Sequence, residues 1–418
     1  MVLTVFFAEC RAVLYHIPQN ISSLTCFVVD FDGTQAPYND VQPLVGPMVR
    51  QTTEQMLNSS EPHLGYITRA PSDFGNDPIA VRQAVFDFKA WAAIIVNANT
   101  TALLRAAVSE GNASYDPLGA AQVIYVQARD QTTYDSYIAP QLAMLQTQIT
   151  SKFGQMWTKM TLQDNSIPVT NLQAAPQALS PAIGFSQFNL RPFNPAVTTP
   201  SVTIGLIYLI IISFFSFSFF LPTYMKLATP TKDHPRVPFW EVVLVRYIGA
   251  NCAYFFMSLA YSLISLAFQI PFANPPASET AVANNATPYG KGTFVVYWMI
   301  NFLGMAALGL ACENATMLVG QPWTALWLIF WVITNVSTSF YSLDLAPKFY
   351  YWGYAWPLQN IVEASRSTLF GLHSRLGLNF GILIAWIVIS STLFPICCYF
   401  MRRKTQKAKA KEAQALDQ

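Results

Sequence analysis

Five long stretches of the chain contain no charged residue, and all of them follow Arg191. They cover residues 192–225, 247–278, 292–312, 314–343 and 376–401. A helix needs about 20 mostly apolar residues to cross the hydrocarbon core of a bilayer, which is about 30 Å thick and cannot solvate an exposed backbone. Buried helices of soluble proteins rarely stay uncharged over such lengths. The pattern therefore predicts five clear spans, forming a transmembrane domain at residues 201–401.

The region before these spans has a different pattern. Short apolar runs rich in β-branched residues alternate with segments of helical spacing, which is typical of an α/β domain. We expect strands at 24–29, 92–96 and 122–126 and helices at 41–57, 78–88, 101–108 and 140–160. The predicted fold class is an α-helical polytopic membrane domain with an inserted α/β domain at residues 18–200.

Charge fixes the expected orientation. Hydrophobic residues make up 53% of the chain and charged residues only 11%, and six basic residues lie between Arg402 and Lys411. Basic residues collect on the cytosolic side of a membrane, so residues 402–418 are expected to form a cytosolic basic tail. Such a run can also bind anionic lipid or nucleic acid, but beside a span we favour the topological interpretation and expect no nucleic-acid partner. Alternation through five spans then makes residues 18–200 extracytosolic.

Acceptor sequences for N-glycosylation agree with this orientation. Those on segments placed outside the cytosol are headed by Asn20, Asn58, Asn99, Asn112 and Asn285. Two others, headed by Asn314 and Asn335, lie where the glycosylation machinery is not expected to reach. The sequence thus predicts a membrane glycoprotein.

An extracytosolic domain that follows a cytosolic start needs a preceding span, and the N-terminal segment does not supply one. Its first residues are mostly apolar, but Glu9 and Arg11 end the run. The run is too short to cross a bilayer and lacks the features of a signal peptide. We interpret residues 1–17 as the remnant of a truncated first transmembrane helix.

One motif suggests catalysis. A hydrophobic run ends in Asp30-Phe-Asp32-Gly-Thr, which is similar to the first motif of haloacid-dehalogenase-type phosphatases. There the first carboxylate attacks phosphorus and the second handles the leaving-group proton beside Mg²⁺. That chemistry also needs a strand-end lysine and a second acidic pair, for which Asp73 and Asp77 are the nearest candidates. The plainer interpretation is a polar turn at a strand end, so a phosphatase is a remote alternative.

No other motif indicates chemistry. The four histidines and six cysteines show no metal-ligand spacing, and the chain contains no phosphate-binding Gly-x-x-x-x-Gly-Lys-Ser/Thr sequence. We therefore predict no catalytic residue, no cofactor and no metal. Any ATP-driven work requires a separate energising subunit.

Three asparagines lie inside predicted spans, each in a different one: Asn251, Asn301 and Asn335. Polar side chains are costly in lipid and usually face the interior of a helix bundle. We favour interhelical hydrogen bonds, worth about 0.5–2 kcal/mol each, over a substrate path.

Short segments spread in order over nearly the whole chain carry a family resemblance. They are Val-Val-Asp-Phe-Asp-Gly at 28–33, Pro-Leu-Val-Gly-Pro at 43–47, Pro-Ala-Ile-Gly-Phe at 181–185, Phe-Asn-Leu-Arg-Pro-Phe at 188–193, Gly-Leu-Ile-Tyr-Leu at 205–209, Tyr-Ala-Trp-Pro-Leu-Gln-Asn at 354–360 and Leu-Gly-Leu-Asn-Phe-Gly-Ile-Leu-Ile-Ala-Trp at 376–386. Together they resemble the fungal nitrosoguanidine-resistance membrane proteins. That family is similar in layout to export-type ABC permeases without the ATPase.

The resemblance implies a non-enzymatic protein of the plasma membrane or an endomembrane that promotes resistance to, or export of, small toxic compounds. A second hypothesis is a regulator of membrane lipid organisation or asymmetry, which would change drug sensitivity indirectly. Membrane lipids are the expected partners, with a homo-oligomer and an energising subunit as further candidates.

Overall fold

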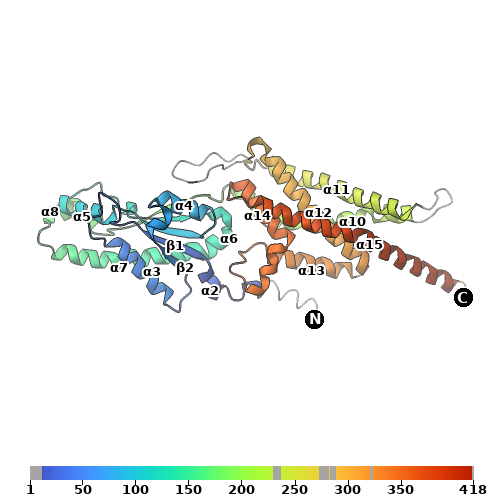
Figure 1. Ribbon diagram of the computed structural model, residues 1–418, viewed down its shortest axis with the longest axis horizontal. Helices are drawn as coiled ribbons and strands as arrows, with labels where there is room; N and C mark the ends of the chain where they lie inside the picture. The colour runs from blue at the N-terminus through green and yellow to red at the C-terminus, as the bar shows by residue number, and fades with distance from the viewer. Residues whose placement is uncertain (1–11, 229–236, 273–281, 283–288, 321–322, 417–418) are drawn as a thin grey trace. The chain divides into compact units, whose positions relative to one another are not determined.

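The computed structural model describes residues 12–228, 237–272, 282, 289–320 and 323–416, and it divides into two compact units (Figure 1). The α/β unit comprises His16–Phe193 with residue 282, and the helical unit comprises the other described residues. Of the expected first-span remnant at 1–17, residues 1–11 lie outside the described residues. Val13, which is described, is buried in a small cluster with Leu343 and Tyr350 of the helical unit.

The α/β unit is built on a mixed five-stranded sheet with the order β2-β1-β3-β4-β5. Its strands are β1 (Thr25–Asp30), β2 (Gly65–Arg69), β3 (Ala92–Val96), β4 (Ala121–Tyr125) and β5 (Phe185–Asn189). β1 pairs in parallel with β2 and β3, whereas β4 runs antiparallel to β3 and parallel to β5. The apolar runs predicted β1, β3 and β4. The edge strands β2 and β5 are partly exposed and polar, so no apolar run marked them.

Helices cover both faces of this sheet. They are α2 (Ile17–Asn20), α3 (Val45–Leu57), α4 (Pro78–Phe86), α5 (Thr100–Glu110), α6 (Gln131–Thr133), α7 (Ala139–Gln163) and α8 (Val169–Ala174). α3 packs against α7, β1 and β2, and α4 packs against β3 and β4. Figure 1 shows α4 across the sheet from α3 and α7. Right-handed crossovers require this arrangement, because the chain moves in opposite directions from β1 to β2 and from β2 to β3.

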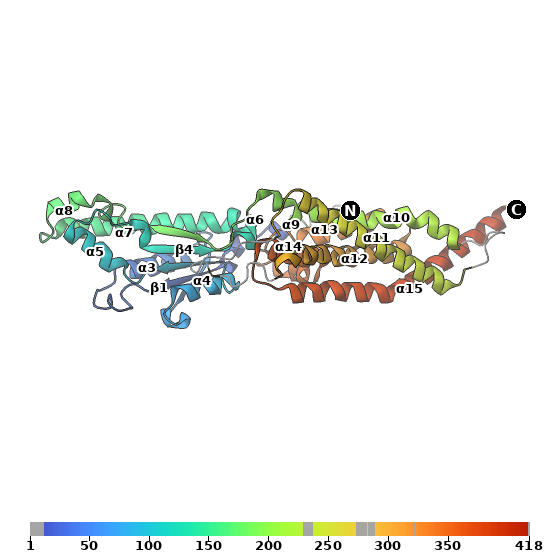
Figure 2. The same cartoon turned by 90° about the horizontal axis from the view of Figure 1, so that it is seen from above.

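The helical unit contains the apolar segments. Its helices are α9 (Thr199–Val202), α10 (Ile207–Ala228), α11 (Phe239–Ala267), α12 (Thr293–Val319), α13 (Thr324–Ser337), α14 (Pro357–Phe370) and α15 (Leu376–Leu416). Among the described residues, four segments are long and apolar enough to cross a membrane: Ala196–Ser216, Phe239–Ala267, Gly290–Val319 and Leu376–Lys407. α12 packs against α10, α11, α14 and α15, and Figure 2 shows it running beside α15.

The predicted span at 314–343 is not one long helix. Its first residues belong to α12, which continues to Val319, and α13 has only 14 residues. At 1.5 Å per residue α13 is about 21 Å long, which is shorter than the hydrocarbon core. Glu313, the one charged residue between the uncharged stretches 292–312 and 314–343, lies inside α12 instead of between two spans. This correction has a physical cause, because a charged partner on another helix accompanies Glu313 into the bundle.

Candidate functional site

A buried ion pair joins α11 to α12. The Nε atom of Arg246 lies 2.8 Å from the Oε1 atom of Glu313, and the two side chains are 1% and 2% exposed. Arg246 lies seven residues after the start of α11, and Glu313 six residues before the end of α12. Both charges are therefore about 10 Å along their helices from the ends that meet on one side of the bundle.

Two further helices, α10 and α15, supply the surroundings of this pair. The guanidinium lies 5.2 Å from the ring centre of Tyr224 in α10 and 5.8 Å from that of Phe394 in α15. Its Nη1 atom is 3.6 Å from the sulfur of Met401, also in α15. Aromatic faces attract a cation, so the two rings offset part of the cost of removing Arg246 from water.

The pair is expensive to keep. Removing two charges from water costs several kcal/mol per ion, and mutual attraction offsets this cost only with good geometry and further hydrogen bonds. Among the described residues, no partner donates a hydrogen bond to the second carboxylate oxygen of Glu313. An intramembrane ionisable residue with an incompletely satisfied carboxylate is a candidate for ion or substrate handling, or for a switch between two helix arrangements.

The three intramembrane asparagines have separate roles. Asn251 is half-buried and donates to the Tyr247 carbonyl of its own helix at 2.8 Å. Asn301 donates to the Ser262 hydroxyl at 2.9 Å, which links α12 to α11. Asn335 accepts from the amide of Leu358 at 3.2 Å, which links α13 to the start of α14. Two of the three predicted residues thus make interhelical bonds.

The ion pair itself was not predicted, although the sequence contains a signal for it. Arg246 directly precedes one uncharged run, and Glu313 alone separates two others. We took such charges as the limits of spans. A single acidic residue inside about 50 otherwise uncharged residues is instead the pattern of a charge within the bundle, which needs a basic partner.

In the α/β unit, Asp32 caps two helices at once. Its Oδ2 atom accepts from the amides of Val45 and Gly46 at 3.2 and 3.4 Å, and its Oδ1 atom accepts from the amide of Thr101 at 3.0 Å. The Thr101 hydroxyl also donates to Oδ2 at 2.5 Å. Neither α3 nor α5 has a side-chain bond from its own N-cap residue, so Asp32 satisfies amides that both helix starts leave open.

Asp30 is held in place by different groups. It accepts from the amide of Asp32 at 3.0 Å, and its Oδ2 atom lies 3.3 Å from Nε of Arg50. Burial raises the pKa of the Asp30 carboxyl, while that amide and the Arg50 guanidinium act in the opposite direction. A Cβ atom at position 46 would stand 1.9 Å from Oδ1 of Asp30, so only glycine lets the start of α3 approach this carboxylate.

Through these contacts the carboxylates of Asp30 and Asp32 have structural roles at the end of β1. The acidic candidates for a phosphatase site have other roles. Asp77 caps α4 by accepting from the amide of Ile79 at 2.8 Å, and Asp73 lies 4.0 Å from Arg69. Within the described residues, no group of three or more His, Cys, Asp or Glu side chains is arranged to hold a metal.

The glycosylation candidates lie at varied depths. Asn58 and Asn112 are exposed, Asn20 and Asn99 are half-buried, and Asn285 lies outside the described residues.

Comparison with known proteins finds a matching family and a similar yeast protein. A family model described as a protein of unknown function, DUF3533, matches residues 1–392. The uncharacterized endoplasmic reticulum membrane protein YJR015W of Saccharomyces cerevisiae is 28% identical over 334 residues, which cover 78% of this chain and 62% of that protein. The chain therefore matches less than two thirds of the length of this relative. No solved structure matches the chain.

Proposed function

The chain belongs to the DUF3533 family and is an integral membrane protein, and from this premise we propose that it promotes resistance to, or export of, small toxic compounds without itself being an enzyme. The observation that carries the proposal is the Arg246–Glu313 pair, which lies where four helices converge. The relative in the endoplasmic reticulum favours an endomembrane over the plasma membrane.

The pair suits a protein that changes helix arrangement. A transported molecule must pass between helices, and packed helices have discrete arrangements instead of a continuum. Separating Arg246 from Glu313 leaves two buried charges unpaired, so any state that parts α11 from α12 has a large electrostatic cost. A bound ion or polar substrate that neutralises Glu313 lowers this cost, which couples binding to movement.

The proposed topology retains five spans, with α13 as a short fifth one. Residues 18–200 are extracytosolic and the C-terminal tail is cytosolic. Because Asn58 and Asn112 are both exposed, glycosylation at these two residues is the most direct test of this orientation. Treatment of the protein made in a glycosylating host with an N-glycosidase should increase its gel mobility, and N58Q with N112Q should reduce the change. If the gel mobility does not change and the C-terminal tail is accessible from the luminal side, the proposed topology is wrong.

The function is tested by transport in reconstituted vesicles. Cells lacking the gene are first tested with toxic compounds to find those that require the protein for resistance. Purified wild-type protein should then carry at least one of them with saturable kinetics, with an energising subunit added if one copurifies. E313Q should reduce the flux at least tenfold at equal protein content.

N251A is the matched control, because Asn251 bonds only within its own helix among the described contacts. This variant should transport like wild type. Absence of saturable flux from wild-type vesicles for every compound that affects the mutant cells would overturn the export proposal.

A second candidate function, regulation of lipid organisation, is favoured by a different observation. A cavity of about 480 Å³ is lined by Met317, Leu318 and Phe400 on its apolar side and by Arg403, Lys404 and Lys407 on its basic side. Lys404 also donates to the Val319 carbonyl at the end of α12, at 3.3 Å. Basic groups beside apolar side chains at the end of a span fit an anionic lipid.

Vesicles with and without phosphatidylserine distinguish this alternative. The triple variant R403Q/K404Q/K407Q should lose the preference for phosphatidylserine, whereas R402Q should keep it because Arg402 lies over the ring of Phe239 instead. Altered exposure of phosphatidylserine on mutant cells without any compound flux would favour lipid regulation over export.

We also propose that the protein forms a homo-oligomer and has no nucleic-acid partner.

A further inference from the structure

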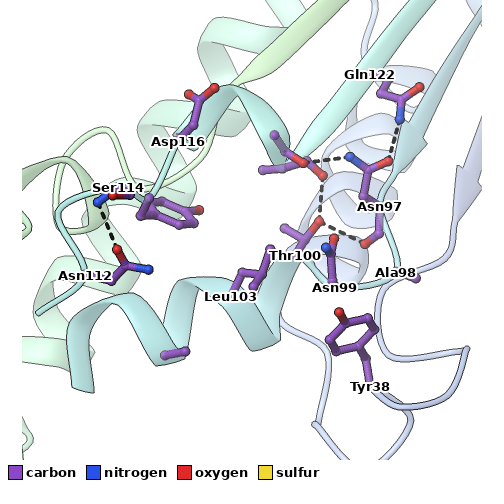
Figure 3. Close-up of a pocket in the computed structure, with 14 residues that line it drawn as sticks. Tyr38, Asn97, Ala98, Asn99, Thr100, Leu103, Asn112, Ser114, Asp116 and Gln122 are labelled. Atoms are coloured by element: carbon purple, nitrogen blue, oxygen red, sulfur yellow. Dashed lines mark hydrogen bonds between the residues drawn. The ribbon is translucent and has the colours of Figure 1, made fainter. Parts of the chain in front are cut away.

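A cavity of about 630 Å³ lies in the α/β unit, beside the ends of β1 and β3 (Figure 3). Tyr38 comes to it from the loop after β1, and residues 97–100 and Leu103 come from the end of β3 and the start of α5. Because β4 is antiparallel to β3, its first residues meet the last residues of β3, which brings Gln122 to the same edge. The loop before β4 contributes Asp116.

This edge is the position at which open α/β sheets bind ligands. From β1 the chain passes through α3 to β2 on one side, and from β2 it passes through α4 to β3 on the other side of β1. The strand order therefore reverses between β1 and β3. Loops that leave neighbouring strands in opposite directions open a crevice outside their carboxyl ends, and ligands bind there.

One wall of the cavity is held by its own hydrogen bonds. Asn97 donates to the Gly119 carbonyl at 2.6 Å and accepts from Gln122 at 2.7 Å. The Thr100 hydroxyl lies 2.9 and 2.6 Å from the carbonyl oxygens of Asn97 and Ala120. These bonds fix the positions of the wall before any ligand arrives, which lowers the entropy lost on binding.

Other polar groups remain available to a ligand. Among the described residues, the side chains of Asn99 and Tyr38 make no hydrogen bond, although Asn99 stands at the N-cap of α5. One oxygen of Asp116 accepts from the amide of Leu118 at 2.9 Å, which leaves the other oxygen open. In Figure 3, Tyr38 and Asp116 lie on opposite sides of the cavity, with Leu103 of α5 between them.

The charge of the lining restricts the ligand. Asp116 is the only carboxylic acid among the lining residues in the described part of the chain, and none of them is Lys, Arg or His. A phosphate or carboxylate group would find no cation among these lining residues, and it would face Asp116. Carboxamides, hydroxyls and tyrosine rings instead match a ligand that presents several hydroxyl groups and an apolar face.

We propose that this cavity binds a neutral polyhydroxylated molecule of the class of sugars and polyols. Asn99, Asp116 and Tyr38 supply its hydrogen bonds, and Leu103 contacts its apolar face. The cavity lies wholly within the α/β unit, so binding there is measurable whether or not the protein exports toxic compounds.

The test uses the full chain made in bacteria, so that neither Asn99 nor Asn112 carries a glycan that could enter the cavity. The protein is purified in a detergent without a sugar headgroup. Binding of glucose, mannose, N-acetylglucosamine and inositol is measured by saturation-transfer NMR and by the shift in unfolding temperature. Glucose 6-phosphate serves as the anionic comparison.

At least one neutral probe should bind saturably and more tightly than glucose 6-phosphate. L103W fills the cavity from a residue that is 45% exposed, so it should weaken binding at least tenfold without disturbing the core. I79W is the matched control, because Ile79 is 44% exposed on α4 and does not line the cavity. Y38A removes a proposed hydrogen-bonding group from a loop and should also weaken binding.

Three results would overturn the proposal. They are the binding of no neutral probe, equal binding by wild type, L103W and Y38A, and tighter binding of glucose 6-phosphate than of glucose.

Discussion

The Nε atom of Arg246 and the Oε1 atom of Glu313 lie 2.8 Å apart inside the helical unit, and this contact ties α11 to α12. The two residues are 67 positions apart in the chain. Each limits a stretch that is otherwise free of charge, so each alone suggests the end of a span. Together they form a polar centre within the bundle.

The pair should show strong coupling in a double-mutant cycle. R246M and E313M each leave one charge buried without its partner, which should cost about 3–5 kcal/mol, whereas R246M/E313M should be neutral or stabilising. Thermal unfolding of the purified protein in detergent measures both. Equal and additive losses in the two single variants would contradict the contact. A double variant that is stable but inactive in transport would assign the pair to function instead of folding.

Gly309 is required by the ring of Tyr254. A Cβ atom at position 309 would stand 2.5 Å from Cζ of Tyr254, so G309A should destabilise the bundle by about 1–3 kcal/mol through overpacking. Gly381 in α15 has no heavy atom within 4 Å of the equivalent position. G381A should therefore stabilise its helix by about 0.5–1 kcal/mol. Unfolding temperatures of the two variants should move in opposite directions, and a shared direction would refute this packing.

Asp32 should contribute more to the stability of the α/β unit than an ordinary helix cap does. D32A removes the acceptor of the Gly46 and Thr101 amides and leaves both buried without a partner, each at a cost of about 1–3 kcal/mol, whereas the Val45 amide keeps a 3.4 Å bond to the Thr101 hydroxyl. D77A removes the cap of α4 alone, at an exposed site, and should cost about 1 kcal/mol. Comparing the unfolding of the two variants tests the shared cap. A loss in D32A no larger than that in D77A would show that other groups satisfy these amides.

Asp30 should make stability fall as pH rises. Burial raises its folded-state pKa above the unfolded value, which is about 3.9, so the folded state keeps the proton where the unfolded state has lost it. The stability that this group contributes is complete below about pH 4 and is lost as pH rises through the folded-state pKa. The difference in unfolding temperature between wild type and D30N should therefore decrease with pH. A difference that grows with pH would mean that Arg50 dominates over burial.

The local sequence pattern was sufficient to predict part of the α/β unit. The runs that predicted β1, β3 and β4 are largely buried, and the helix predicted at 140–160 is α7, whose buried face includes Leu142, Leu145 and Ile149. The edge strands β2 and β5 escaped prediction because a strand with one protected side needs few apolar residues. The Asp30–Asp32 motif marked an important strand end, but its sequence could not reveal that Asp32 bonds with Thr101, 69 residues further along.

The apolar runs alone determined that this is a membrane protein, because the free energy of placing a segment in lipid is close to a sum over its own residues. Tertiary structure decided where the helices end and which charges lie inside. The cost of burying Glu313 depends on Arg246, which another helix supplies, so no window of sequence contains the answer. The same holds for the cavity beside β3, whose lining comes from three separate segments that only the strand order brings together.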